Sequence, residues 1–275
     1  MFCSRNFRRV TRVIFIVFSG IVLGGATCQR QVTEKDKKES TIHLELAHNY
    51  LKQGDIISAR REALLSVEKD PYNSEAHYSL AYIFGQMEDW QNALKEIKKS
   101  IEIDDKKTEA QNFLGVVLIN LERYDEAIEI LDKLTKNFLY HSPHLAYGNL
   151  GLAYFKKKEY SKALEALKKS VSLQPLFCLG YFRMGKVYFE MGRLMEAIEA
   201  LEKCISVEDE WQECKKFQDA YLLLGDVYSK INAQDKAQEG YQKCVELNPN
   251  NPVGVECKRK KDAISSSPGA EGENK

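Results

Sequence analysis

The chain repeats itself with a period of 34 residues, and this period constrains its fold more than any other feature. Each unit contains a large residue followed by a small one, and an alanine lies twelve residues after the small one. The spacing of successive units is 34, 34, 36, 34 and 40, so residues are inserted before the fourth and the sixth unit. The large-small pairs are Leu46-Ala47, Leu80-Ala81, Leu114-Gly115, Leu150-Gly151, Met184-Gly185 and Leu224-Gly225, and the alanines are Ala59, Ala93, Ala127, Ala163, Ala197 and Ala237.

This recurrence in phase resembles the tetratricopeptide repeat (TPR), in which helix A and helix B of each unit are joined by a turn, here near Gly54 or Gly192. The small residues indicate where the two helices cross too closely for a larger side chain. One helix pair cannot bury its apolar face alone, so the pairs stack. The resemblance implies an all-α fold, a right-handed superhelical solenoid of six helix-turn-helix repeats with a C-terminal capping helix. The expected repeats are 40–73, 74–107, 108–141, 144–177, 178–211 and 218–251, followed by a cap at 252–264 and a disordered tail at 265–275.

Residues 1–27 have the order of a secretion signal. Four arginines (Arg5, Arg8, Arg9 and Arg12) precede residues 13–26, which are 14 uncharged residues. As a helix these would extend about 21 Å, whereas a membrane span needs about 20 residues, so a signal peptide is favoured over a stable transmembrane helix. We expect residues 28–40, which are polar, to form a flexible tether.

The signal ends at Gly24-Gly25-Ala26-Thr27-Cys28, which resembles a bacterial lipobox. In a lipobox the cysteine is lipidated and becomes the first residue of the mature chain. The match departs from the usual pattern, because Gly25 and Thr27 stand where Leu and a Gly or Ala are usual. Ordinary cleavage after Ala26 and an uncleaved anchor remain alternatives, and all three place the rest of the chain outside the cytoplasm. Gln29 after the cysteine implies sorting to the outer membrane, as in lipoproteins of enterobacterial type.

The composition argues against a nucleic-acid binder, and the remaining motifs argue against an enzyme. Lys+Arg and Asp+Glu both number 40, so no basic field indicates a nucleic-acid binder. The sequence has no HExxH, no Cys/His zinc pattern, no phosphate-binding loop and no nucleophile elbow. His141 and His144 flank Pro143 without a nearby Cys or carboxylate, which is typical of a surface turn. We therefore expect a non-enzymatic protein with no metal or cofactor.

The TPR resemblance also implies a binding surface. In a TPR stack the concave side is formed by positions 2, 5, 9 and 12 of each helix A, counted from the first residue of each repeat. The residues at these positions are mostly aromatic or aliphatic, and an apolar groove suits a hydrophobic strand or an amphipathic helix of a partner. The alternative is that about half of these side chains pack between adjacent A helices. TPR domains that bind a chaperone's C-terminal carboxylate use Lys and Asn at positions 5 and 9. Here only Asn112 and Lys186 have those identities, and they lie on different repeats. We therefore reject that mode of binding. The candidates are Tyr78, Tyr82, Asn112, Val116, Ile119, Leu152, Phe155, Phe182, Lys186 and Phe189.

Five of the seven cysteines lie between residues 178 and 257. Cys204 and Cys244 both occupy position 27, near the end of helix B, and each is followed by a cysteine near the next helix. Short loops between antiparallel neighbours allow disulfides, and an oxidising compartment preserves them. We predict the pairs Cys204–Cys214 and Cys244–Cys257, with Cys178 left free and buried. The alternative is that position 27 only requires a small residue, because it is a serine in three other repeats (Ser66, Ser100 and Ser170).

A lipobox-like signal followed by six TPRs resembles the PilF/PilW/Tgl family of pilotins, the TPR lipoproteins of type IV pilus biogenesis. That family carries a stretch similar to Tyr140-x-Ser142-Pro143-x-x-Ala146-x-x-Asn149-Leu150-Gly151 at the corresponding insertion. Its members are outer-membrane lipoproteins that help a secretin subunit to reach the membrane and to multimerise. The resemblance implies a membrane-anchored scaffold with a secretin partner. A periplasmic TPR adaptor of another envelope assembly or maturation pathway is the alternative.

Overall fold

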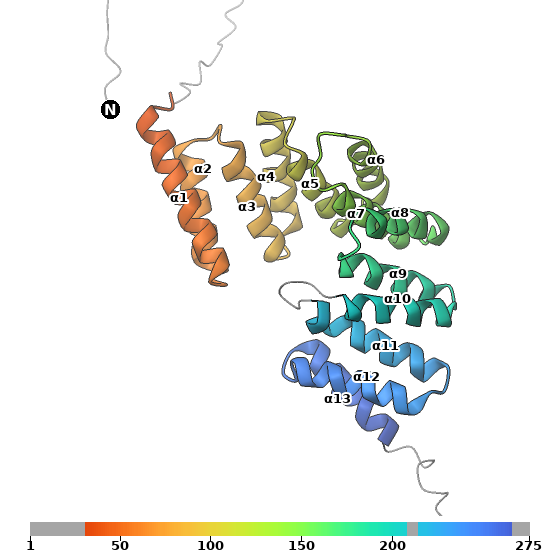
Figure 1. The fold of residues 1–275 in the computed structure, drawn as a ribbon. Coiled ribbons are helices and arrows are strands. Elements are labelled where there is room, and N and C mark those ends of the chain that lie inside the picture. The colour runs from red at the N-terminus through yellow and green to blue at the C-terminus, as the bar shows by residue number, and fades with distance from the viewer. Residues whose placement is uncertain (1–30, 208–213, 266–275) are drawn as a thin grey trace, which may run out of the picture.

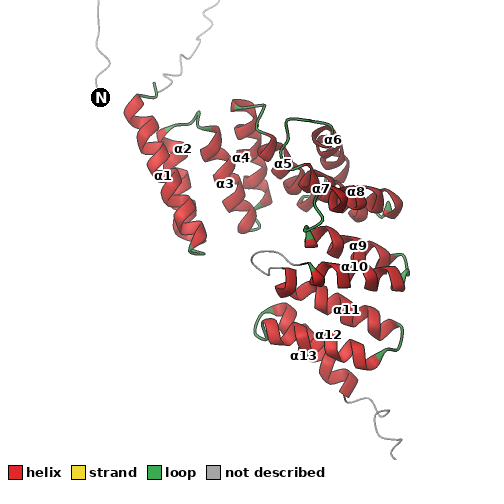
Figure 2. Ribbon diagram, viewed as in Figure 1, coloured by secondary structure: helices red, strands yellow, loops and turns green. Residues whose placement is uncertain are grey.

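The computed structural model describes residues 31–207 and 214–265, and all regular structure within them is helical (Figure 2). The predicted signal peptide, Cys28 and almost all of the C-terminal tail lie outside these ranges. Among the helices of the described part, none combines the length and the apolar character of a membrane span.

Within residues 31–207 and 214–265, the helices form six antiparallel pairs followed by a last helix. The first helix of each pair is helix A and the second is helix B. A short 3-10 helix, η1 (Cys214–Lys216), precedes the sixth pair, and α13 (Pro252–Ser265) follows it. The predicted fold class, an all-α TPR solenoid, is confirmed. The pairs are α1 (Glu34–Lys52) with α2 (Ile56–Lys69), α3 (Ser74–Gln86) with α4 (Trp90–Ile103), α5 (Thr108–Asn120) with α6 (Tyr124–Thr135), α7 (Pro143–Lys156) with α8 (Tyr160–Leu173), α9 (Cys178–Glu190) with α10 (Leu194–Ser206), and α11 (Gln218–Lys230) with α12 (Gln234–Leu247).

Close crossing of the two helices of a pair explains the small residue at position 8. A Cβ atom added at Gly151 would lie 2.6 Å from Cγ of Leu167, and one at Gly185 would lie 2.7 Å from Cγ of Leu201. Both leucines are fully buried. Glycine at position 8 therefore makes room for a large residue of helix B, and the pair is close-packed as a protein interior must be.

The turn between helix A and helix B places one residue of every repeat at positive φ. Two of these residues are glycines, Gly54 at φ +78° and Gly192 at φ +72°. The other four have side chains, and left-handed backbone costs such residues about 1–2 kcal/mol. They are Glu88, Glu122, Lys158 and Asn232, with φ between 58° and 62°.

The first helix begins inside the segment predicted to be a tether. Thr33 caps α1, because its Oγ1 accepts from the backbone N–H of Asp36 at 3.2 Å. The Asp36 carboxylate in turn accepts from the backbone N–H of Thr33 at 2.9 Å, which completes a capping box. Ser40, at the end of the predicted tether, is buried against Ser66. The tether prediction was therefore wrong for residues 34–40, because the polar residues there form the first turns of a capped helix.

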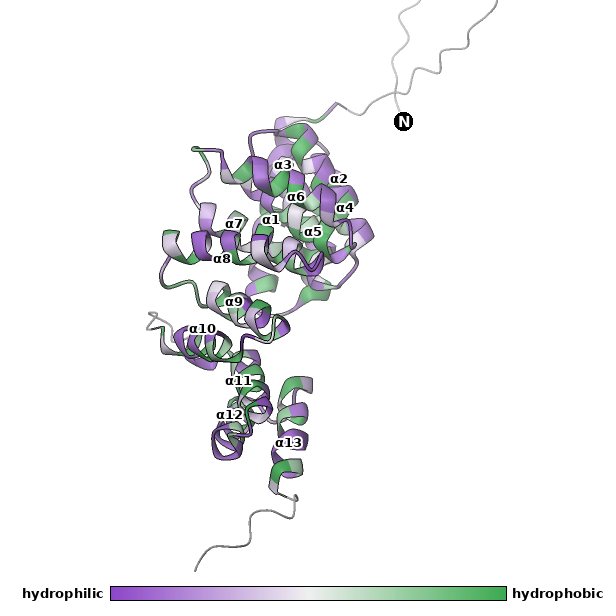
Figure 3. Ribbon diagram, turned by 90° about the vertical axis from the view of Figure 1, so that its right-hand side faces the viewer, coloured by the Kyte–Doolittle hydropathy of each residue, from purple (hydrophilic) through white to green (hydrophobic). Residues whose placement is uncertain are grey.

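The pairs stack into a bent solenoid. One row runs from α1 to α8, and the stack then turns so that α9 to α13 form a second arm (Figure 1). Hydrophilic and hydrophobic residues share every helix, as amphipathic packing requires (Figure 3). At the N-terminal end Ile42 and Leu46 are exposed, because no helix pair of the described part packs over positions 3 and 7 there. At the other end α13 covers the last pair, where Lys260 forms an ion pair with Asp226 at 2.6 Å and Asp226 accepts from the Tyr241 hydroxyl at 2.7 Å.

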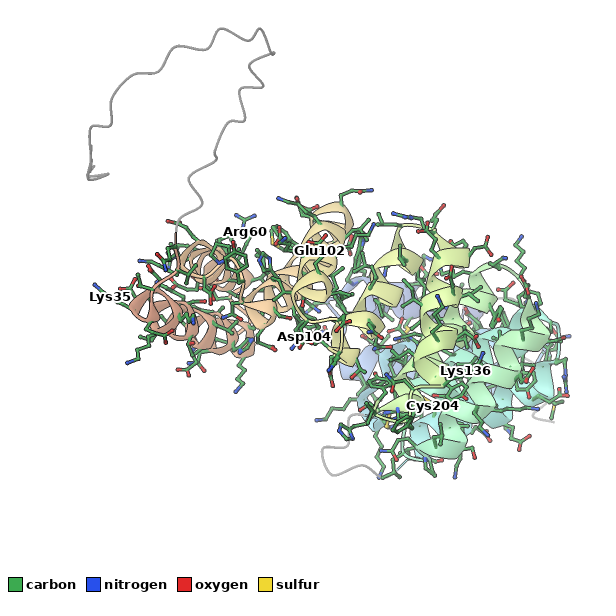
Figure 4. All side chains as sticks on the ribbon, turned by 90° about the horizontal axis from the view of Figure 1, so that it is seen from above. Lys35, Arg60, Glu102, Asp104, Lys136 and Cys204 are labelled. Carbon is green, nitrogen blue, oxygen red and sulfur yellow. A yellow bond between two sulfur atoms is a disulfide. The ribbon has the colours of Figure 1, made fainter. Side chains whose placement is uncertain are left out.

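In the part of the chain that the structure describes, two disulfides join the C-terminal repeats. Cys244 pairs with Cys257, as predicted, with Cα atoms 6.1 Å apart. Cys214 pairs with Cys178 instead of Cys204, with Cα atoms 5.7 Å apart, so that prediction was wrong. The thiol of Cys204, labelled in Figure 4, is free and buried.

The position of Cys204 within its repeat explains the difference. The hydroxyls of Ser66 and Ser170, at the same position 27, donate to the backbone oxygen at position 1 of their own repeat, which belongs to Ser40 and His144. Cys204 contacts the backbone of Phe182, at position 5 of its repeat, and burial raises the pKa of its thiol to about 12. Cys214 instead lies at the other side of the inserted loop, where its Sγ is 3.9 Å from the carbonyl oxygen of Leu176, just before Cys178.

Candidate functional site

The inner surface of the solenoid is formed by the A helices. Successive A helices contact one another along the whole stack, from α1 and α3 to α11 and α13, whereas successive B helices make no contact of similar extent in the described residues. A stack curves toward the side on which neighbouring elements are closest, so the A helices lie on the inside. We call the side chains at positions 2, 5, 9 and 12 of these helices the inner groove.

Most of the predicted groove residues are accessible. Tyr82 is 40% exposed and Lys186 is also exposed. Ile119, however, is only 4% exposed and packs in the core with Leu150 and Ala153. It is therefore not kept in the groove, because the inserted turn brings α7 closely against α5 and buries position 12 of the third repeat. The half-buried members are Tyr78, Asn112, Val116, Leu152, Phe155, Phe182 and Phe189.

The inserted turn is held by the tyrosine of the sequence stretch singled out above. Tyr140 is buried with Leu134 and Ala146, and burial raises the pKa of its hydroxyl to about 12. The preceding Phe138 is 92% exposed. The insertion thus anchors one aromatic side chain and presents another at the surface, outside the inner groove.

In repeats three to five, position 6 of helix A packs against the preceding repeat. In the third repeat this residue is Phe113, whose ring lies 6.1 Å from that of Tyr78 and 5.7 Å from that of Tyr82. In the fifth repeat the equivalent residue is Arg183. Its Nη1 lies 3.3 Å from the place where a Cβ of Gly148 would be. A charged side chain therefore occupies a place that holds an aromatic ring two repeats earlier.

A line of polar side chains runs from this arginine across three A helices. Nη1 of Arg183 donates to Oδ1 of Asn149 at 3.1 Å. Nδ2 of Asn149 donates in turn to Oδ1 of Asn112 at 3.1 Å. We call Asn112, Asn149 and Arg183 the polar track. Burial lowers the pKa of the Arg183 guanidinium to about 10, which still leaves it charged at neutral pH.

Lysines lie over the phenylalanines of the groove. Nζ of Lys186 is 5.5 Å from the ring centre of Phe182 and 6.0 Å from that of Phe155. Nζ of Lys230 is 3.9 Å from the ring centre of Phe189. Burial lowers the pKa of Lys186, and the neighbouring Lys156 adds to that effect. These arrangements are cation–π contacts, and they make the groove of repeats four to six both aromatic and basic.

The narrow middle of the groove has room for the tip of a side chain but not for a small molecule. Beside Arg183 a pocket of about 10 Å³ is lined by Leu152, Phe155 and Lys186, far below the roughly 300 Å³ of a small-molecule site. The groove ends at a wider cavity of about 520 Å³ lined by Phe189, Lys230 and α13. Another cavity, of about 700 Å³, lies outside the groove, between Tyr181, Tyr188 and α10.

Two of the histidines form hydrogen bonds within their own repeat. Nδ1 of His77 lies 2.7 Å from the carboxylate of Glu96, and Nδ1 of His43 lies 2.8 Å from that of Glu62, at the same positions of the first two repeats. These hydrogen bonds lower the pKa of both carboxyls. No group of three His, Cys, Asp or Glu side chains in the described ranges is arranged to hold a metal ion.

Sequence reasoning missed Asn149 and Arg183. Both occupy position 6, which is outside the positions taken to line the groove. One signal was available: Arg183 is the first charged residue of α9 and interrupts an otherwise apolar run. Its contact with Asn149 joins different repeats and has no local signature in the sequence.

The fold and the groove define this chain as a TPR protein. Residues 144–176, 180–210 and 218–251 match the tetratricopeptide repeat family. Residues 61–134 match the anaphase-promoting complex, cyclosome, subunit 3. No curated protein matches the chain.

Solved structures of TPR proteins share the fold. The crystal structure of PilW, a widely conserved type IV pilus biogenesis factor, is similar at a TM-score of 0.67 and 22% identity, over 79% of this chain and 97% of PilW. Pseudomonas aeruginosa PilF gives 0.62 and 21%, over 83% of this chain and 100% of PilF. Cut9, in the APC/C hetero-tetramer Cut9–Hcn1, gives 0.67 and 19%, but only 43% of it is covered. In fold, the chain is a TPR protein that resembles PilF and PilW.

Proposed function

We propose that this protein is a non-enzymatic interaction scaffold of the bacterial cell envelope. In this proposal it is a pilotin-like outer-membrane lipoprotein facing the periplasm, which helps a secretin subunit to reach the outer membrane and multimerise during type IV pilus biogenesis. Its partner is a protein, and it contacts the membrane through lipid on Cys28.

The observation that carries the proposal is the accessible aromatic groove along a solenoid of the same extent as PilW and PilF. Those two proteins are matched over nearly their whole length, whereas Cut9 is matched over less than half. The groove offers Tyr82 on α3, Phe155 on α7 and Phe189 on α9. Aromatic side chains of this kind often dominate the energy of a protein–protein interface.

The two disulfides support a location outside the cytoplasm. Structural disulfides form and persist in oxidising compartments and are rare in the cytosol. Cys178–Cys214 and Cys244–Cys257 therefore agree with a secreted chain. Mass spectrometry of the mature protein tests the anchor: we expect a lipid-modified Cys28 at the N-terminus, and a mature chain that begins at Thr27, or retains Met1, would contradict it.

Crosslinking in the native cell, followed by co-purification, tests the function. We expect a secretin subunit to be captured, and fewer secretin multimers when the gene is deleted. Phe155→Ala with Phe189→Ala should weaken binding about a hundredfold, because burying one aromatic is worth roughly 1.5–3 kcal/mol. Tyr72→Ala is the matched control, because Tyr72 is exposed in the loop between the first two repeats.

Melting followed by circular dichroism separates binding from packing. If the double variant unfolds at a much lower temperature and loses binding only in proportion, these side chains belong to the core and the groove is not the binding site. If it melts normally and still assembles secretin, the surface lies elsewhere, and Phe138→Ala then tests the inserted turn. Capture of a different envelope assembly instead of secretin would favour the adaptor role.

A further inference from the structure

Arg183 carries a charge that the described fold does not neutralise. The side chain is half-buried, and its guanidinium lies among Gly148, Asn149 and Leu152, in the place where Phe113 lies in the third repeat. No carboxylate of the described residues forms an ion pair with it. Burying a charge without an opposite charge is costly. A solenoid that needed only packing at this position would gain by an apolar residue, as the third repeat does.

The neighbouring groups add positive charge instead of balancing it. Lys186 lies one turn further along α9, lines the same small pocket, and forms no ion pair within the described part. Lys156 acts on Lys186 from α7. Glu190 and Asp219 attract Lys186 from a distance, but neither makes a direct contact with it. Asn149 supplies one acceptor, whereas a guanidinium has five N–H donors.

We propose that the inner groove of repeats four and five binds an internal acidic–apolar segment of a partner protein, with an Asp or Glu side chain between Arg183 and Lys186. Apolar residues on either side of that acid lie over Leu152 and Phe155 in one direction and over Phe182 and Phe189 in the other. The fork of a guanidinium matches a carboxylate with two parallel hydrogen bonds. This inference rests on the groove of the proposed function, but it does not depend on the partner being a secretin.

The form of the groove favours an acid within a chain over a terminal carboxylate. Groove residues continue on both sides of the cationic pair, toward Tyr82 in one direction and toward Phe189 and the wider cavity under α13 in the other. A chain end would leave one of these directions empty. The pocket beside Arg183 holds only the tip of a side chain. The occupant is therefore an extended or helical segment that crosses the pair.

Selection from a library of short random peptides with amidated C-termini tests the proposal on the full mature chain. We expect the bound peptides to be enriched in Asp or Glu next to aromatic or aliphatic residues. For the most enriched peptide, replacing its acid by Gln should weaken binding about tenfold to a hundredfold in fluorescence anisotropy, because a hydrogen bond to a charged group is lost. Arg183→Gln with Lys186→Gln should abolish the difference between the two peptides.

A matched control removes the same charge elsewhere. Lys168→Gln with Lys203→Gln neutralises two exposed lysines on B helices, outside the groove, and should leave the preference intact. If Arg183→Gln lowers the melting temperature, two milder variants replace it: Arg183→Lys, and Lys186→Gln, which changes an exposed side chain. Each should reduce the preference for the acidic peptide while the melting temperature stays unchanged.

Several outcomes would overturn the proposal. The selection could yield no binder, or binders that are not enriched in acidic residues. The acidic peptide and its Gln form could bind equally well. The control variant could lose the preference for the acidic peptide as fully as the Arg183 and Lys186 variant does. Binding that requires a free C-terminus would exclude an internal segment. The two proposals fail separately, because a scaffold with another partner can still prefer acidic peptides, and a secretin-binding groove can lack that preference.

Discussion

Removing the disulfide between Cys178 and Cys214 should destabilise the C-terminal arm of the solenoid. The bond joins residues separated by 36 positions and encloses the whole fifth helix pair. The chain-entropy relation for a closed loop of this length gives about 4 kcal/mol. Cys178→Ser should therefore lower the free energy of unfolding by about 4 kcal/mol under oxidising conditions.

Urea unfolding followed by circular dichroism measures this loss. At a slope of about 3 kcal/mol per molar urea, the midpoint should fall by about 1.3 M. With a reductant present, the wild type and Cys178→Ser should unfold at nearly the same concentration, because neither then has the bond.

Cys204→Ser is the matched control and discriminates between the two possible partners of Cys214. Serine occupies the same position in three other repeats, where its hydroxyl donates to the backbone oxygen at position 1 of the repeat, so the cost should be about 1 kcal/mol or less. Non-reducing peptide mapping should recover Cys178 linked to Cys214. The reasoning is refuted if mapping links Cys204 to Cys214, or if Cys204→Ser destabilises the protein as much as Cys178→Ser does.

Three further outcomes are expected. Lys158→Gly should raise the melting temperature by relieving about 1 kcal/mol of left-handed backbone cost, and no change would mean that the turn is unstrained. Gly151→Ala should lower stability by about 1–3 kcal/mol, because the new Cβ would meet Leu167, and a gain in thermal melting would contradict the close crossing. The hydrogen bond from His77 lowers the pKa of Glu96 below its ordinary 4.5, so this bond contributes stability above that pH, and the stability is lost as pH falls through the lowered folded value. Glu96→Gln should therefore reduce the acid dependence of unfolding, and an unchanged pH profile would show that the pair is not linked to folding.

The sequence by itself determined the repeat and its register. Position 8 is small and position 20 is alanine in every unit because helix A and helix B of one unit cross there, and such a contact is set within one stretch of about 34 residues. Gly151 and Ala163 show this directly, since both pack within a single helix pair. The fold class follows from this periodicity, because amphipathic pairs of one kind can bury their faces only by stacking.

Only the tertiary structure decided the contacts between repeats. The partner of Cys214 depends on how close η1 lies to the start of α9. The burial of Ile119 depends on the approach of α7, and the contact of Arg183 with Asn149 depends on the gap left by Gly148. Each of these contacts joins side chains of different helix pairs. Their distances follow from how one pair is set against the next, a relation that the pattern of a single repeat does not contain.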